Sequence, residues 1–196
     1  TANAFILLTD CSPNASSTAA VAAPQGYLTL SNDASNPVST SDQVAATLVY
    51  YTPFVGNQIP IWNGSAFVLY SFAQLQLTLS GSQIGSTIYD VCVFLNSTVP
   101  TLAAGPAWSN STAGASARGT GAGTPQLQRV NGIWVNQVQI TGLNGGSTYT
   151  IAANQCTYVG SILTDTSAGQ VSTYVSYGQS RKWGVWNAYN RQRIVL

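Results

Sequence analysis

The sequence contains no histidine, no methionine and no glutamate, and charged residues make up only 6% of its 196 residues. Catalysis by side chains at neutral pH needs a proton carrier, an activated nucleophile or a bound metal. Without histidine, the Ser-His-Asp and Cys-His arrangements are excluded. The five aspartates, at positions 10, 33, 42, 90 and 165, form no local pair. We therefore predict that the protein is not an enzyme and holds no metal or cofactor, with a glycosidase-like pair of aspartates as the lower alternative.

The scarcity of charge also bears on association. The formal net charge is +1 at pH 7, so copies of the chain repel one another only weakly, and such proteins tend to associate. So weak a field does not favour a nucleic-acid partner. No run reaches the roughly 18 apolar residues of a membrane-spanning helix. We predict a homo-oligomer with no nucleic-acid or membrane partner.

Cysteine is scarce as well. Cys11, Cys92 and Cys156 are odd in number and show no CxxC spacing. No histidine or clustered aspartate is present to complete a zinc site. Cys92 lies in an apolar run, where a thiol behaves as a small hydrophobic side chain. We predict three unpaired thiols, with a Cys92–Cys156 bridge as the alternative.

The first 26 residues differ in composition from the rest. Residues 11–26 are small, polar and interrupted by proline, and such a segment buries too little apolar area to become ordered alone. A short apolar run without the basic flank of a signal peptide precedes them: Phe5, Ile6, Leu7 and Leu8. We predict an N-terminal docking arm over residues 1–26, tethered by this run, and a single domain over residues 27–196.

The domain shows short strand patterns separated by turn residues. Asn63-Gly64 and Asn131-Gly132 lie between apolar runs, and Asn-Gly accepts the positive φ angles of a two-residue hairpin loop. Leucines alternate with polar residues over 75–79, which is typical of a half-buried strand. Residues 88–95 form the most apolar strand and are expected at the centre of the sheet.

The stretch from 96 to 126 loses this periodicity and is predicted to be a long loop. Arg118 begins a glycine run there that lacks the lysine of a phosphate-binding loop. Further strands are predicted over 148–152, 157–163 and 170–176. About ten to twelve short strands with such spacing predict an all-β fold, an antiparallel β-sandwich or jelly-roll-like domain with an extended N-terminal arm.

Residues 180–193 hold two of the five tryptophans and four of the six basic residues. As a helix, this stretch would place its aromatic rings on one face. As a strand, it would place Trp183 and Tyr189 on one face and Trp186 on the other, and we favour this extended form because the flanking sequence is strand-like. Tryptophan and arginine dominate many interfaces, so we predict an intersubunit contact through these residues: Arg181, Trp183, Trp186, Tyr189, Arg191 and Arg193.

Several segments resemble proteins encoded by phages and prophages. They include Tyr50-Tyr51-Thr52-Pro53-Phe54-Val55-Gly56-Asn57, Ile59-Pro60-Ile61-Trp62-Asn63-Gly64 and Val185-Trp186-Asn187-Ala188-Tyr189-Asn190-Arg191. The resemblance covers residues 27–193 and is to virion components of the head-decoration, head-fibre or tail-fibre kind. Its motifs are not catalytic. The chain departs from the pattern in having few acidic residues after Gln170.

The resemblance implies a structural protein on the exterior of a phage particle. We expect a homo-oligomer, a trimer, whose arm docks on a major capsid or tail protein. The alternative is a host-recognition module that binds a surface glycan through the predicted 100–125 loop and exposed aromatic residues. A glycoside hydrolase is the lower alternative.

Overall fold

The computed structural model describes residues 22–108, 118 and 127–192. These residues form fifteen β-strands and no helix, and all the strand pairs are antiparallel. The prediction of an all-β antiparallel fold is confirmed. The predicted tether at residues 5–8, Cys11 and Arg193 lie outside the described residues.

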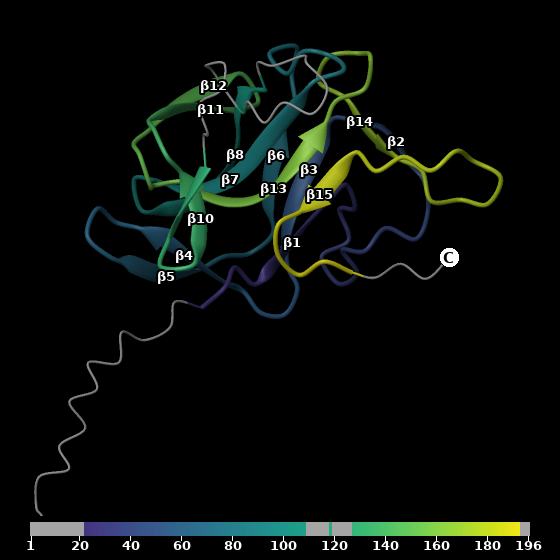
Figure 1. The fold of residues 1–196 in the computed structure, drawn as a ribbon. Coiled ribbons are helices and arrows are strands. Elements are labelled where there is room, and N and C mark those ends of the chain that lie inside the picture. The colour runs from purple at the N-terminus through teal and green to yellow at the C-terminus, as the bar shows by residue number, and fades with distance from the viewer. Residues whose placement is uncertain (1–21, 109–117, 119–126, 193–196) are drawn as a thin grey trace, which may run out of the picture.

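The strands follow one another along the chain as shown in Figure 1. They are β1 (Gly26–Thr29), β2 (Gln43–Ala46), β3 (Leu48–Pro53), β4 (Gln58–Trp62), β5 (Phe67–Ser71), β6 (Leu75–Thr78), β7 (Ile88–Asn96), β8 (Val99–Ala107), β9 (Leu127–Val130), β10 (Ile133–Asn136), β11 (Ile140–Asn144), β12 (Ser147–Ile151), β13 (Thr157–Leu163), β14 (Val171–Thr173) and β15 (Val185–Asn187).

The strands form one large sheet and three small ones. The large sheet has the order β12-β11-β8-β7-β13-β10-β9, and β15 also pairs with β13. A three-stranded sheet has the order β1-β3-β6, and the pairs β14-β2 and β4-β5 complete the fold. The two main sheets enclose the larger core, to which they contribute Leu28, Val49, Tyr51, Leu77, Val91, Val93, Leu102 and Val159. The fold is therefore a β-sandwich.

The prediction that residues 88–95 form a strand at the centre of the sheet is confirmed, and this strand is β7. β7 lies in the middle of the eight-stranded large sheet, between β8 and β13, and its side chains at positions 91 to 94 are buried. In β6, Leu77 is buried and Gln76 is exposed, so the half-buried strand is confirmed.

The two Asn-Gly hairpins form, but with different loops. Val130 pairs with Ile133, and Asn131 and Gly132 have φ angles of 47° and 88°, which is the predicted two-residue loop. In the other hairpin Trp62 pairs with Phe67, so four residues form the loop and the two-residue prediction was wrong. The reason is local, because Asn63 Oδ1 accepts hydrogen bonds from the amides of Ser65 and Ala66 (3.0 and 2.9 Å) and widens the turn.

The predicted long loop was partly wrong. Residues 99–107 form β8, which pairs with β7 over most of its length and with β11 at Ala104. Its buried residues are Leu102 and three small ones, Ala103, Ala104 and Gly105. At the start of the predicted loop, Asn96 still belongs to β7, and after β8 the structure describes Trp108 and Arg118. The predicted arm boundary also needs correction, because Pro24 and Gly26 are buried in the domain.

The prediction of three unpaired cysteines was wrong. Cys92 of β7 and Cys156, next to β13, form a disulfide between residues 64 apart in the sequence. Both cysteines are buried in a second, smaller core with Phe94, Ala103, Ile140 and Ile151. The alternative that we considered, a Cys92–Cys156 bridge, is therefore the one that forms.

Among the described residues, no helix has the length and hydropathy to cross a membrane.

Candidate functional site

Residues 182–192, which we call the tryptophan segment, lie along the edge of β13 in extended form from Gly184 to Asn187, and then bend at residues 188–190, where Asn190 has a φ of 53°. β15 pairs with β13 from Gly160 to Ile162. Backbone hydrogen bonds continue the contact on both sides, from the Leu163 amide to the Gly184 carbonyl (2.9 Å) and from the Ala188 amide to the Val159 carbonyl (2.9 Å). The extended conformation that we favoured over a helix is confirmed.

Two asparagine side chains join the tryptophan segment to β1, which lies beside β15 in Figure 1. Asn187 Oδ1 accepts a hydrogen bond from the Leu28 amide (2.6 Å), and its Nδ2 donates to the Leu28 carbonyl (2.8 Å). Asn190 Nδ2 donates to the carbonyls of Pro24 and Gly26 (both 2.9 Å). A carboxamide has one donor and one acceptor side, so Asn187 pairs with β1 as a neighbouring strand would.

The tryptophan segment carries two exposed indole rings. Trp183 and Trp186 are 46% and 56% exposed, although tryptophan is largely buried in most proteins. Both line a hollow of about 290 Å³ with Tyr27 and Arg191, and both line a second hollow of about 430 Å³ with Trp108 and Arg118. The prediction that they lie on opposite faces of a strand was wrong, because the strand covers only Val185–Asn187.

Each hollow is bordered by an arginine that packs on aromatic rings. The Arg191 guanidinium lies 4.9 Å from the ring centre of Trp186, and its Nε donates to the Asn187 carbonyl (3.1 Å). The Arg118 guanidinium lies 4.6 Å from the Trp108 ring and 5.6 Å from the Tyr158 ring. Such cation–π contacts fix both the ring and the guanidinium, so the surface is preorganised.

A buried carboxylate anchors Arg118. Arg118 Nη1 lies 3.3 Å from Asp90 Oδ1, and Ser161 Oγ donates to the same oxygen (2.8 Å). Tyr158 OH lies 2.8 Å from Ser161 Oγ. Burial raises the pKa of Asp90, while Arg118 and Ser161 act in the opposite direction. The Arg118–Asp90 pair therefore places the Arg118 guanidinium beside the second hollow, and the Asp90 carboxylate compensates its positive charge.

The variant Arg118→Met is expected to lower the free energy of unfolding by about 2 kcal/mol at pH 7 and by much less at pH 3. Without the arginine, the pKa of Asp90 rises further above its value in the unfolded chain. A carboxyl shifted in this direction favours the fold when protonated, and this contribution is lost as the pH rises through the folded-state pKa. Urea unfolding of the variant and of the wild type at pH 3, 5 and 7 measures the difference.

Arg129→Met is the matched control for this experiment. The Arg129 guanidinium also packs on a tryptophan, 5.6 Å from the Trp134 ring, but forms no ion pair among the described residues. Its effect should be small and independent of pH. An equal loss of stability at all three pH values in Arg118→Met would contradict the proposed role of the Asp90 charge.

The remaining basic residues of the stretch are tied to the domain. Arg181 Nη1 donates to the carbonyls of Val175 and Ser176, away from the two hollows. Lys182 forms an ion pair with Asp165. Tyr189 OH accepts a hydrogen bond from the Trp134 amide (3.0 Å). Of the predicted interface residues, the structure brings together Trp183, Trp186 and Arg191, while Tyr189 and Arg181 hold the chain in place.

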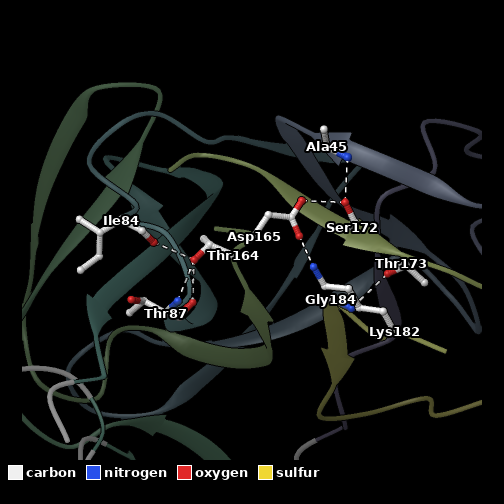
Figure 2. A network of polar contacts seen from close by, with 9 residues as sticks. All are labelled: Ala45, Ile84, Thr87, Thr164, Asp165, Ser172, Thr173, Lys182 and Gly184. Atoms are coloured by element: carbon white, nitrogen blue, oxygen red, sulfur yellow. Dashed lines mark hydrogen bonds and ion pairs between the residues drawn. The ribbon is translucent and has the colours of Figure 1, made fainter. Parts of the chain in front are cut away.

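Figure 2 shows how Asp165 secures the start of the tryptophan segment. Its carboxylate pairs with Lys182 Nζ and accepts a hydrogen bond from Ser172 Oγ (2.7 Å), which itself accepts from the Ala45 amide (2.9 Å). Desolvation acts to raise the pKa of Asp165, but Lys182 and Ser172 outweigh it and hold the pKa below its usual range. β2, β14 and the segment are thus joined through one carboxylate (Figure 2).

The described aspartates each serve a separate structural contact. Asp42 Oδ1 accepts from the amides of Val175 and Ser176 (2.7 and 2.8 Å), which lower its pKa. Asp33 Oδ1 accepts from the Ser35 amide (2.9 Å), as aspartate does in many turns. Among the described residues, no group of three or more histidine, cysteine, aspartate or glutamate side chains could hold a metal ion.

Sequence reasoning missed Asp90, Arg118 and Trp108. One signal was available, because Asp90 is a charged residue inside the most apolar run, and a buried charge requires a partner. The identity of that partner could not be read from the sequence, since Arg118 lies 28 residues away.

Comparisons of the chain with protein-family models, with curated proteins and with solved structures gave no match. The geometry of the tryptophan segment and the sequence pattern are therefore the basis for interpreting its function.

Proposed function

We propose that the protein is a non-enzymatic structural component of a bacteriophage particle, a capsid-decoration protein or a head- or tail-fibre subunit on the exterior. The tryptophan segment is its contact with neighbouring copies in a homotrimer. A major capsid or tail protein is the docking partner of the assembled subunits.

The observation that supports this proposal most strongly is the pair of exposed tryptophans between two hollows. Exposed tryptophan with arginine at its side is the composition of the few residues that dominate protein interfaces. Arg191 packs on Trp186. The pairing of β15 with β13 and the hydrogen bonds of Asn187 and Asn190 hold the segment rigidly. A rigid aromatic surface loses little conformational entropy on association, which suits a permanent subunit contact.

Three further features favour a particle exterior. The segment belongs to the part of the sequence that resembles phage virion proteins. The Cys92–Cys156 disulfide is of a kind that persists on virion and cell surfaces and is rare in the reducing cytosol. The net charge of +1 allows many copies to pack side by side with little mutual repulsion.

The double variant Trp183→Ser and Trp186→Ser is expected to convert the trimer into a monomer. Removing a dominant interface tryptophan costs at least about 2 kcal/mol, so each substitution should raise the dissociation constant by roughly 30-fold. Sedimentation velocity of the full chain at tens of micromolar measures the oligomeric state. Both side chains are already exposed, so thermal unfolding of the monomer should change little.

Tyr177→Ser is the matched control, because Tyr177 is fully exposed and lines neither hollow. It should leave the oligomer intact. A wild-type protein that sediments as a monomer, or a double variant that still forms the trimer, would contradict the interface. Electron cryo-microscopy of particles assembled with the chain tests its location, and its absence from the outer surface of the particle would overturn the virion assignment.

A further inference from the structure

A groove separate from the two hollows of the tryptophan segment lies where β4, β7 and β12 come together. This groove has a volume of about 550 Å³, within the range of sites that bind small ligands. One side is formed by Trp62 and Asn63 at the β4–β5 turn, and another by Asn96 and Ser97 at the β7–β8 turn. β12 and Gln155 complete it.

The floor of this groove is rigid. Phe94 and Ile151 line the groove and also belong to the smaller core, which contains the Cys92–Cys156 disulfide. Tyr149 packs against the same core, with its ring centre 5.1 Å from that of Phe94. A covalent bond and close packing therefore fix the groove before any ligand arrives, which lowers the entropic cost of binding.

The polar groups that line the groove are all neutral. They are carboxamides and hydroxyls, contributed by Asn63, Asn96, Ser97, Thr148, Thr150 and Gln155. None of the described residues that line it carries a charge. Carboxamides and hydroxyls both donate and accept hydrogen bonds, which matches a ligand whose own groups do both. An anionic or cationic ligand would find no opposite charge to offset its desolvation.

Two aromatic rings border the same groove. Trp62 is only partly buried and is held edge-on by Phe67, with the ring centres 5.2 Å apart. Tyr149 is also partly buried. An aromatic ring with a fixed orientation offers a flat apolar face with polar groups beside it. A pyranose ring has the complementary pattern, with a C–H face and hydroxyls around its edge.

We infer that this groove is a binding site for a neutral carbohydrate of one to three sugar units. Trp62 and Tyr149 contact the C–H faces of the sugar, while the carboxamides of Asn63, Asn96 and Gln155 bind its hydroxyls. Asn63 Oδ1 is occupied by the β4–β5 turn, so its Nδ2 is the group that donates. The inference does not depend on the proposed subunit contact, since the groove shares no lining residue with the two hollows of the tryptophan segment.

An array of neutral and sialylated glycans, probed with the full chain, tests the inference. Binding to at least one neutral glycan is expected, and titration calorimetry with that glycan should give the same affinity at pH 5 and pH 8 and in 0.5 M salt. Silence across the neutral glycans, binding only to the sialylated ones, or loss of binding in salt would each overturn it. No binding would also be seen if a segment of a second copy filled the groove, and the carbohydrate assignment would then be wrong as well.

Three variants locate the bound sugar. Trp62→Ala should weaken binding at least tenfold, and Gln155→Ala should weaken it about threefold to tenfold. Gln155→Ala is the safeguard, because Trp62 also packs on Phe67 and its loss can disturb the hairpin. Trp134→Ala is the control, an exposed tryptophan outside the groove, and should not alter affinity. Unchanged binding in Gln155→Ala together with Trp62→Ala would overturn the assignment to this groove.

Trimerisation and sugar binding fail separately. Loss of the trimer in the Trp183 and Trp186 double variant with retained sugar binding would support both proposals. If the wild-type protein is a monomer and binds a neutral glycan, only the interface proposal is contradicted. If it is a trimer and binds no neutral glycan, only the carbohydrate site is contradicted.

Discussion

Replacing both Cys92 and Cys156 by alanine is expected to lower the free energy of unfolding by about 4 kcal/mol. The disulfide joins residues 64 apart, so it excludes a large set of unfolded conformations that the variant regains. It also ties β7 to the start of β13 at the centre of the large sheet. Urea unfolding at pH 7, followed by tryptophan fluorescence, measures the loss.

A reducing agent provides the control for the disulfide prediction. It should destabilise the wild-type protein by a similar amount and leave the double alanine variant unchanged, because the variant has no bond at this place to reduce. If the wild-type midpoint does not move under full reduction, verified by thiol titration, the disulfide has little influence on stability and the prediction fails. The same reduction should loosen the floor of the groove described above and weaken its sugar binding.

Gly184→Ala is expected to destabilise the domain by about 3 kcal/mol. A Cβ atom at this position would overlap the carbonyl oxygen of Ser172 and lie 2.5 Å from Val171 Cγ1. The glycine lets the tryptophan segment pass directly over β14, and the Gly184 amide donates to Thr173 Oγ1 (3.2 Å). Because backbone atoms cannot move aside cheaply, the segment must lift away. Thermal unfolding should show a midpoint lower by roughly 10 °C.

Gly81→Ala is the control for this substitution. A Cβ atom there meets nothing within 4 Å, and the backbone is not in the left-handed region. Its effect should be slight and can be stabilising, since alanine restricts the unfolded chain. If both alanine variants unfold at the same temperature as the wild type, the close approach at Gly184 does not constrain the fold. If the proposed trimer forms through the tryptophan segment, Gly184→Ala should also weaken it, because the substitution displaces Trp183 and Trp186.

The strands that could be predicted are those with a strong local pattern. β13 begins and ends at the predicted residues, 157 and 163, and Asn131-Gly132 forms the expected turn because Asn and Gly tolerate positive φ. β8 was missed because small residues and two prolines predict a loop. Its neighbours in the sheet determine its conformation, since Ala103 fits opposite Gly142, where a Cβ atom would lie 3.1 Å from that of Ala103.

The candidate site could be predicted only in part, for a similar reason. The density of tryptophan and arginine near the C-terminus marked the segment that carries the exposed Trp183 and Trp186. The tertiary fold decides which of these side chains are exposed, because Asp165 pairs with Lys182, Trp134 binds Tyr189, and the domain's own carbonyls bind Arg181. Contacts of this kind join residues far apart in the sequence, and no local pattern encodes them.

The pairing of Asn187 with Leu28 spans 159 residues, which has a consequence for biosynthesis. The edge of β1 can be completed only after the ribosome has synthesised the chain as far as Asn187. β13 and β14, which the tryptophan segment also contacts, are synthesised earlier, so the segment is the last of these elements to be placed. A chain that stops before Asn187 therefore lacks this pairing, and we expect it to be unable to form the subunit contact that we propose.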